Sequence, residues 1–444
     1  MLNISHNDDP TNIDGLGQTK FIQDIAYVIK NSSPPKGIAI NGYWGTGKTS
    51  CLIQLMRELN DEKVIPVWFE AWRYQYEEMP IVALLNKIRA EFRNSTKLIK
   101  AMKKIGEVTA LGVIGAFDET IKVASGGLIS PKLSELKKIG VNYEKDNFLH
   151  TQHSDQISTL LEDAIDLVLK NDEIKFRSDK KKLVIFIDDL DRCNPESALK
   201  LLEGIKVFLN LKNCVIIFAI DQRQIEQALT KALGLKNESN SYQAREYLEK
   251  ICQDIYHLPL PNAEQKADYL DNLLLNLDLS GNAFVGRTKT IHNKKIRDNI
   301  KLVITEFDCL PANPRKIKAL SNRLSVVLRK QVELSEVIYM DKNPLILRSY
   351  TLLIASTIIY TFHRELNEQL NKNPDCIRSI LSYSLSPDDS NPMIKTLMKE
   401  VNPSFDGINL LPTNPSDSNV FRLQTLFIAL DVVTKDEIKP FLGI

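Results

Sequence analysis

The stretch Gly37–Thr49, GIAINGYWGTGKT, decides the fold that we expect for this chain of 444 residues. It begins with an apolar run typical of a β-strand, and Gly42–Thr49 then fits the pattern GxxxxGK followed by Ser or Thr. The apolar residues that come next fall at helical spacing: Leu52, Leu55, Met56 and Leu59. A strand, a glycine-rich loop and a helix in this order predict a loop whose backbone N–H groups surround phosphate oxygens at the positive end of the helix.

Each position of this loop has an expected part in holding a nucleoside triphosphate. Lys48 would place a cation between the terminal phosphates, and the Thr49 hydroxyl would be a ligand of Mg²⁺. The other residues expected to bind the nucleotide are Gly42, Tyr43, Trp44, Gly45, Thr46, Gly47 and Ser50. A chance glycine loop would explain neither the strand before it nor the helix after it. We therefore expect ATP with Mg²⁺ as the ligand.

A second apolar run, Leu183–Ile187, ends in the acidic stretch DDLDR. We expect Asp188 to hold the metal ion together with its waters, and Asp189 to be the catalytic carboxylate that polarises the attacking water. Asp191 and Arg192 would lie further out, on the side of the γ-phosphate, where Arg192 is a candidate to act on a neighbouring subunit. The alternative is a capped loop with surface charges. Three carboxylates within four positions behind a buried strand favour the functional interpretation.

Further strand-like runs alternate with helical patterns, which predicts an α/β fold around a parallel sheet: Val64–Phe69, Cys214–Ile220 and Ile255–Leu260. Val64–Phe69 lies between the phosphate-loop run and the acidic run. That order is typical of the P-loop proteins in which an extra strand separates the phosphate-loop strand from the acidic strand. This class of P-loop proteins contains AAA+ ATPases and motors. No base-reading NKxD motif of a GTPase follows a strand.

The length between the strand-like runs predicts three parts. Residues 1–79 and 181–261 would form the P-loop core. Residues 80–180 are too many for a simple crossover and would form a helical insertion. Residues 262–444 show helical periodicity and would form a C-terminal helical region.

Two residues outside these motifs are candidates to sense the nucleotide. Asp221 ends a strand-like run, where it would sense the γ-phosphate or cap the following helix. Arg315 opens a helix after an Asn-Pro pair, where it would reach the triphosphate or belong to a solvated basic face with Lys316, Lys318 and Arg323. The sequence leaves both pairs of alternatives open.

The composition excludes several classes of protein. A formal net charge of +1 gives no general attraction to nucleic acid, and six scattered cysteines without a CxxC pair indicate neither disulfides nor zinc. The N-terminus has no signal-peptide pattern. The two apolar stretches, residues 108–117 and 349–362, are shorter than the roughly 20 residues of a membrane span. We therefore expect a cytoplasmic protein without a membrane span.

The whole set of motifs resembles the KAP family of P-loop NTPases over about residues 10–330. The resemblance rests on DGLG at Asp14–Gly17, GYWGTGKTS at Gly42–Ser50, FEAWRYQYEE at Phe69–Glu78, IDDLDRCNPE at Ile187–Glu196, FAIDQRQI at Phe218–Ile225, YLEKI at Tyr247–Ile251, HLPLP at His257–Pro261 and NPRKIK at Asn313–Lys318. It implies an ATPase core with strand order 5-1-4-3-2 and an attached helical lid. It also implies family roles for Lys48, Thr49, Asp188, Asp189, Asp191 and Arg315. Many family members carry membrane helices between the two phosphate motifs, and bacterial members are often associated with defence against phage.

The sequence leaves three functions open. The first is an ATP-driven conformational or assembly switch that acts as a homo-oligomer or through a partner effector protein. The second is a nucleic-acid-dependent AAA+-like motor or clamp ATPase, for which Lys294, Lys295, Arg297 and residues 315–330 would supply a basic stripe. The third is an ATP-binding scaffold without turnover, in which Asp189 is catalytically idle.

Overall fold

The computed structural model describes residues 5–59, 64–77, 80–91, 182–206, 209, 213–233, 241–277, 279, 286–330 and 344–372, with 426 and 430. They fall into two compact units. The first, the sheet unit, comprises Thr11–Ile13 and Thr19–Leu258, and the second, the helical unit, comprises Met1–Pro10, Asp14–Gln18 and Pro259–Ile444. Most of the predicted insertion, from residue 92 to residue 180, lies outside the described residues.

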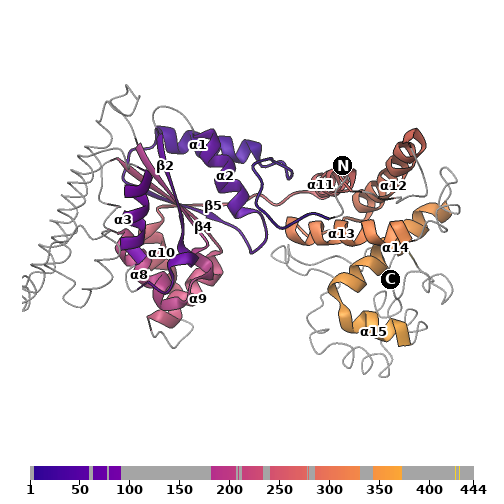
Figure 1. Cartoon of the computed structure of the whole chain (residues 1–444). Coiled ribbons are helices and arrows are strands. Elements are labelled where there is room, and N and C mark those ends of the chain that lie inside the picture. The colour runs from indigo at the N-terminus through magenta and orange to yellow at the C-terminus, as the bar shows by residue number, and fades with distance from the viewer. Residues whose placement is uncertain are drawn as a thin grey trace, which may run out of the picture. The chain divides into compact units, whose positions relative to one another are not determined.

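The sheet unit is built on a five-stranded sheet in the order β2-β3-β4-β1-β5, with every pair parallel (Figure 1). The strands are β1 Lys36–Asn41, β2 Val64–Glu70, β3 Lys182–Asp188, β4 Cys214–Ile220 and β5 Asp254–His257. Read from the other edge, this is the order 5-1-4-3-2. The expected α/β class and strand order are confirmed.

The strand between the phosphate-loop strand and the acidic strand is not the one that comes between them in the sequence. β4 pairs with both β1 and β3, whereas β2 pairs only with β3 and lies at the edge of the described sheet. Order along the chain does not fix order across a parallel sheet, because each crossover can pass over several strands. As a result, Asp221 at the end of β4 lies between the two phosphate motifs.

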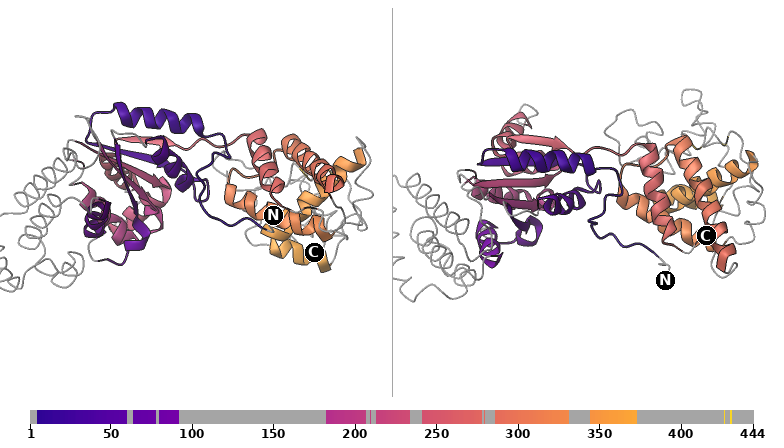
Figure 2. Two further views of the ribbon diagram at one scale, coloured as in Figure 1. Left: turned by 45° about the horizontal axis from the view of Figure 1, so that its top comes forward. Right: turned by 90° about the horizontal axis from the view of Figure 1, so that it is seen from above.

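Alternate residues of the central strands enter two separate cores, as the period of a strand requires. Ile38, Phe186 and Ile217 pack on one face with helices α1 (Thr19–Asn31) and α2 (Lys48–Glu58). Ala39, Ile185 and Ile216 pack on the other face. The helices on that face are α3 (Pro80–Glu91), α8 (Pro195–Ile205), α9 (Gln222–Ala232) and α10 (Ser241–Ile251), as Figures 1 and 2 show. Burial on both faces explains the continuous apolar runs in the sequence.

Two short 3-10 helices follow strands at the same edge of the sheet. They are η1 (Ala71–Tyr74) after β2 and η2 (Leu190–Arg192) after β3.

The last strand, β5, is shorter than the apolar run that predicts it. The Leu258 N–H still donates to the Asn41 carbonyl at 2.8 Å. Pro259 and Pro261 then lack the N–H groups needed to continue the ladder.

The described residues of the helical unit pack around one apolar cluster that includes Leu16, Leu270, Leu320 and Ile354. Its helices are α11 (Ala263–Leu275), α12 (Gly286–Phe307), α13 (Pro314–Lys330), α14 (Pro344–Phe362) and α15 (Arg364–Lys372). The apolar stretch 349–362 lies within α14, whereas the stretch 108–117 lies outside the described residues. No helix in the described part of the chain is long and apolar enough to cross a membrane.

Candidate functional site

The loop between β1 and α2 requires glycine at three positions. Gly45 and Gly47 have φ values of 83° and 96°, which side chains other than glycine rarely adopt. A Cβ on Gly42 would lie 2.8 Å from the Thr46 hydroxyl oxygen. Gly47 precedes the first turn of α2 without any side-chain cap, so the N–H groups of that turn face the loop. The local sequence thus produces the predicted phosphate-binding shape.

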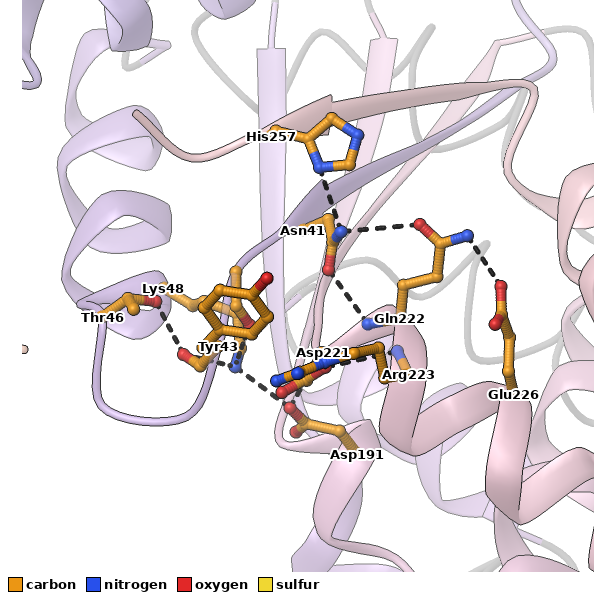
Figure 3. Close-up of polar contacts among 11 residues, drawn as sticks. Asn41, Tyr43, Thr46, Lys48, Asp191, Asp221, Gln222, Arg223, Glu226 and His257 are labelled. Carbon is orange, nitrogen blue, oxygen red and sulfur yellow. Dashed lines mark hydrogen bonds and ion pairs between the residues drawn. The ribbon is translucent and has the colours of Figure 1, made fainter. Parts of the chain in front are cut away.

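The Lys48 ammonium lies inside this loop, and the residue as a whole is 8% exposed. Its Nζ atom donates to the Gly42 carbonyl at 2.9 Å and the Tyr43 carbonyl at 3.4 Å, and lies 3.0 Å from Oδ2 of Asp191 (Figure 3). Three contacts match the three N–H donors of a lysine. A phosphate oxygen would therefore have to replace one of these acceptors.

Asp188 ends β3 with its carboxylate almost fully buried. Burial and the neighbouring Asp189 carboxylate raise the pKa of Asp188 to about 6, against a hydrogen bond from Thr49. The two predicted Mg²⁺ ligands, Thr49 and Asp188, therefore meet, although they come from different segments of the sheet edge. Oxygen atoms are the ligands that Mg²⁺ prefers, and it commonly takes one or two protein groups together with substrate phosphates. These residues fit such an ion.

Asp189 has a left-handed backbone, with φ 58°, directly after β3. An aspartate tolerates this conformation better than most residues, at a cost of roughly 1 kcal/mol or more. Its Oδ1 atom lies 3.0 Å from Nε of Arg192. Burial, more than any charge, raises the pKa of Asp189. Arg192, expected as a candidate to act on a neighbouring subunit, is thus ion-paired with Asp189 of its own chain.

Asp191 turns back toward the phosphate loop instead of pointing outward. Besides its ion pair with Lys48, its Oδ2 atom accepts the backbone N–H of Asp221 at 2.9 Å. Its side chain is 6% exposed. This one carboxylate therefore joins the phosphate loop, η2 and the end of β4. No sequence signal predicts the contact, because it depends on the turn of η2.

Asp221 caps α9, as one of the two alternatives predicts. Its Oδ1 atom accepts the backbone N–H of Arg223 at 3.2 Å and lies 3.5 Å from Nε of the same residue. The Arg223 guanidinium carbon lies 4.0 Å from the centroid of the Tyr43 ring. Sequence reasoning missed Arg223, although it stands in the motif FAIDQRQI, because the stacking on Tyr43 joins two segments far apart in the chain.

A second polar group at this edge of the sheet connects three strand ends (Figure 3). The Asn41 amide donates to Nδ1 of His257 at 3.1 Å and to Gln222 at 3.4 Å, and the Asn41 side-chain oxygen accepts the Gln222 backbone N–H at 2.9 Å. Gln222 in turn donates to Glu226 at 2.7 Å. These contacts fix the residue before the phosphate loop relative to β5 and α9. They were not expected from the sequence.

The remaining predicted residues have varied positions. The Trp44 side chain is 61% exposed, the Thr46 hydroxyl donates to the Tyr43 carbonyl at 2.6 Å, and the Ser50 hydroxyl accepts the Thr11 N–H at 3.1 Å. Arg315 belongs to the helical unit, where its Nε atom pairs with Asp8. Its predicted contact with the triphosphate therefore stays a prediction.

The chain is similar to known proteins at the level of a family model and of individual relatives. A model described as the KAP family P-loop domain matches residues 18–331. The chain is similar to an uncharacterized protein of Methanocaldococcus jannaschii, with 28% identity over 176 residues that cover 35% of this chain and 90% of the relative. It is also similar to the phage T7 exclusion protein of Escherichia coli strain K12, with 23% identity over 252 residues. That match covers 51% of this chain but only 30% of the exclusion protein.

Proposed function

Because this chain belongs to the KAP family of P-loop domains, we propose that it binds ATP with Mg²⁺ at the Gly42–Thr49 loop and hydrolyses it. The observation that carries the proposal is the meeting of Lys48, Thr49 and Asp188 at one edge of the sheet, with Asp189 beside them. A glycine loop alone would support only phosphate binding. A buried carboxylate next to the loop hydroxyl supports metal-assisted chemistry.

Each residue has a distinct part in this proposal. Lys48 exchanges its contact with Asp191 for a phosphate oxygen and keeps the two loop carbonyls. Thr49 and Asp188 hold Mg²⁺, which when bound neutralises charge on the β- and γ-phosphates. Asp189 orients the attacking water and accepts its proton, for which a carboxylate with a raised pKa is better suited than an ordinary one.

Steady-state phosphate release from ATP tests the proposal. Lys48→Ala and Asp189→Asn should each lower turnover by about 100-fold or more, the usual effect of losing a phosphate-binding cation or a general base. Lys20→Ala, on the exposed face of α1, is the matched control and should keep full turnover. ATP binding measured separately should be lost in Lys48→Ala and kept in Asp189→Asn. An unaltered chain that neither binds nor hydrolyses ATP would refute the proposal.

We further propose that ATP turnover drives a conformational or assembly switch in anti-phage defence, with a second copy or a partner effector protein. Support comes from the similarity to a protein named for the exclusion of phage T7. Plating of phage T7 on bacteria that express the chain measures this directly. Plaque numbers should fall with the unaltered chain and recover with Lys48→Ala. Equal plaque numbers for the two would contradict a nucleotide-dependent role against that phage.

The nucleic-acid alternative receives less support from the helical unit. Arg297 pairs with Asp271 at 3.1 Å, Arg315 with Asp8, and the Lys318 ammonium donates to the Asp9 carbonyl at 3.0 Å. Charges engaged within the unit contribute less to a basic stripe. ATP turnover should therefore change less than twofold when DNA or RNA is added at low salt, where such binding is strongest.

A further inference from the structure

Arg223 places a guanidinium group beside the phosphate loop. It lies in the first turn of α9, three residues after the end of β4, and its side chain is 57% exposed. Its guanidinium carbon stacks 4.0 Å from the centre of the ring of Tyr43, the second residue of the Gly42–Thr49 loop (Figure 3). The planar group is thus oriented by a residue of the loop itself.

The guanidinium and the Lys48 ammonium belong to one chain of contacts. Lys48 contacts Asp191, Asp191 accepts the N–H of Asp221, and Asp221 lies beside Arg223. The closest contact that the structure gives between the Asp221 carboxylate and the guanidinium is 3.5 Å, longer than a strong charged hydrogen bond. The planar guanidinium group of Arg223 is therefore held in place, while part of its N–H donors stay available to a ligand.

Lys48 and Arg223 can each turn to a ligand while the carboxylate that it leaves keeps a hydrogen bond. If Lys48 turned to a phosphate, Asp191 would keep the N–H of Asp221. If Arg223 turned to a phosphate, Asp221 would keep the N–H of Arg223 through its helix cap. Each carboxylate would therefore keep a backbone hydrogen bond, which avoids the additional cost of a buried acceptor without any donor.

We propose that Arg223 contacts the terminal phosphate of the triphosphate bound to the same chain. Tyr43 and Asp221 keep the Arg223 guanidinium group beside the phosphate loop. The inference rests on the proposed ATP binding and adds the residue that distinguishes ATP from ADP. The contacts of Arg223 also differ from those of the two arginines that the sequence singled out, Arg192 and Arg315. Arg192 is engaged by Asp189 at 3.0 Å and Arg315 by Asp8, whereas Arg223 stacks on the loop itself.

Calorimetric binding of Mg²⁺-ADP and of a Mg²⁺-ATP analogue with a non-hydrolysable β,γ-imido bridge tests the proposal. Arg223→Ala should weaken binding of the triphosphate about tenfold or more and leave ADP binding within twofold, because only the triphosphate carries the contact. Arg223→Lys should recover part of the loss, since it keeps the charge but not the planar fork. Tyr43→Leu should lower the triphosphate preference a few-fold, because the stacking surface is removed.

Arg245→Ala is the matched control, since Arg245 is an exposed arginine of the same unit that pairs with Glu249 on α10. Its affinities for both nucleotides should equal those of the unaltered chain. Arg223→Gln keeps a polar side chain without the charge and replaces Arg223→Ala should the alanine variant fold poorly. An unchanged ratio of triphosphate to diphosphate affinity in a folded Arg223 variant overturns this inference alone. An unaltered chain that binds neither nucleotide overturns it together with the proposed function.

Discussion

The buried ion pair between Lys48 and Asp191 makes a prediction about stability that can be checked without nucleotide. Both side chains are nearly buried, with 9% and 6% exposed, and the two charged atoms are 3.0 Å apart. Breaking such a pair by removing one partner costs about 3–5 kcal/mol. Asp191→Ala also leaves the Asp221 N–H without its acceptor. Because Lys48 keeps two carbonyl acceptors, we expect the lower end, about 3 kcal/mol.

Asp191→Asn should cost less than Asp191→Ala. Its amide oxygen can still accept the Asp221 N–H, so the main loss is the charge opposite Lys48. Removing that charge also relieves repulsion with the carboxylates of Asp188 and Asp189. A hydrogen bond to a charged group contributes about 1.5–3 kcal/mol, and the relieved repulsion offsets part of it, so we expect a net loss of about 1–2 kcal/mol. The double variant with Lys48→Met should be less destabilised than the sum of the single variants by about 1–2 kcal/mol.

Tryptophan emission during urea unfolding measures this prediction cleanly. The three tryptophans of the chain, Trp44, Trp68 and Trp72, all belong to the sheet unit, so their emission reports the unfolding of that unit. Asp24→Asn, at an exposed position of α1, is the matched control and should unfold like the unaltered chain. Equal stability of all Asp191 variants, or strict additivity with Lys48→Met, would show that the ion pair contributes nothing in solution.

Three further predictions concern the surrounding structure. Lys182→Met should lower the stability of the sheet unit by about 1–2 kcal/mol. The Lys182 ammonium donates to three carbonyls at the end of α1 at 2.7–2.9 Å, and methionine cannot replace these hydrogen bonds. An unchanged urea midpoint would contradict this prediction. Asn262→Ala removes the capping box of α11 and should cost the helical unit about 1 kcal/mol, visible in circular dichroism but not in tryptophan emission. Burial and the Asp191 and Asp189 carboxylates raise the pKa of Cys193 to about 12, so mass spectrometry should find it almost unalkylated by iodoacetamide at pH 8 until the protein unfolds.

The phosphate loop could be predicted from the sequence because its determinants are local. Glycine is needed at positions 45 and 47 for a positive φ and at position 42 for lack of space. The apolar runs on both sides of the loop predict its strand and the helix that follows. The position of Asp188 could be predicted in the same way, because it requires only the apolar run of a buried strand before it. These features repeat in any chain with the same short pattern.

The contacts around Lys48 could not be predicted in the same way. The Asp191 side chain reaches Lys48 because η2 turns it back, and Arg223 stacks on Tyr43 because β4 lies next to β1. Each contact joins residues more than 100 positions apart in the chain. Sequence patterns report the period of an element and its capping residues but not which distant side chain meets it.

The sequence by itself therefore determined the α/β class, the place of the phosphate loop and the acidic end of β3, since these depend on short-range pattern and backbone sterics. Only the tertiary structure decided that β4 separates β1 from β3, because parallel strands are ordered by their crossovers and packing. It also decided which charge faces which at the site. The pairing of Lys48 with Asp191 and the stacking of Arg223 on Tyr43 are consequences of that strand order.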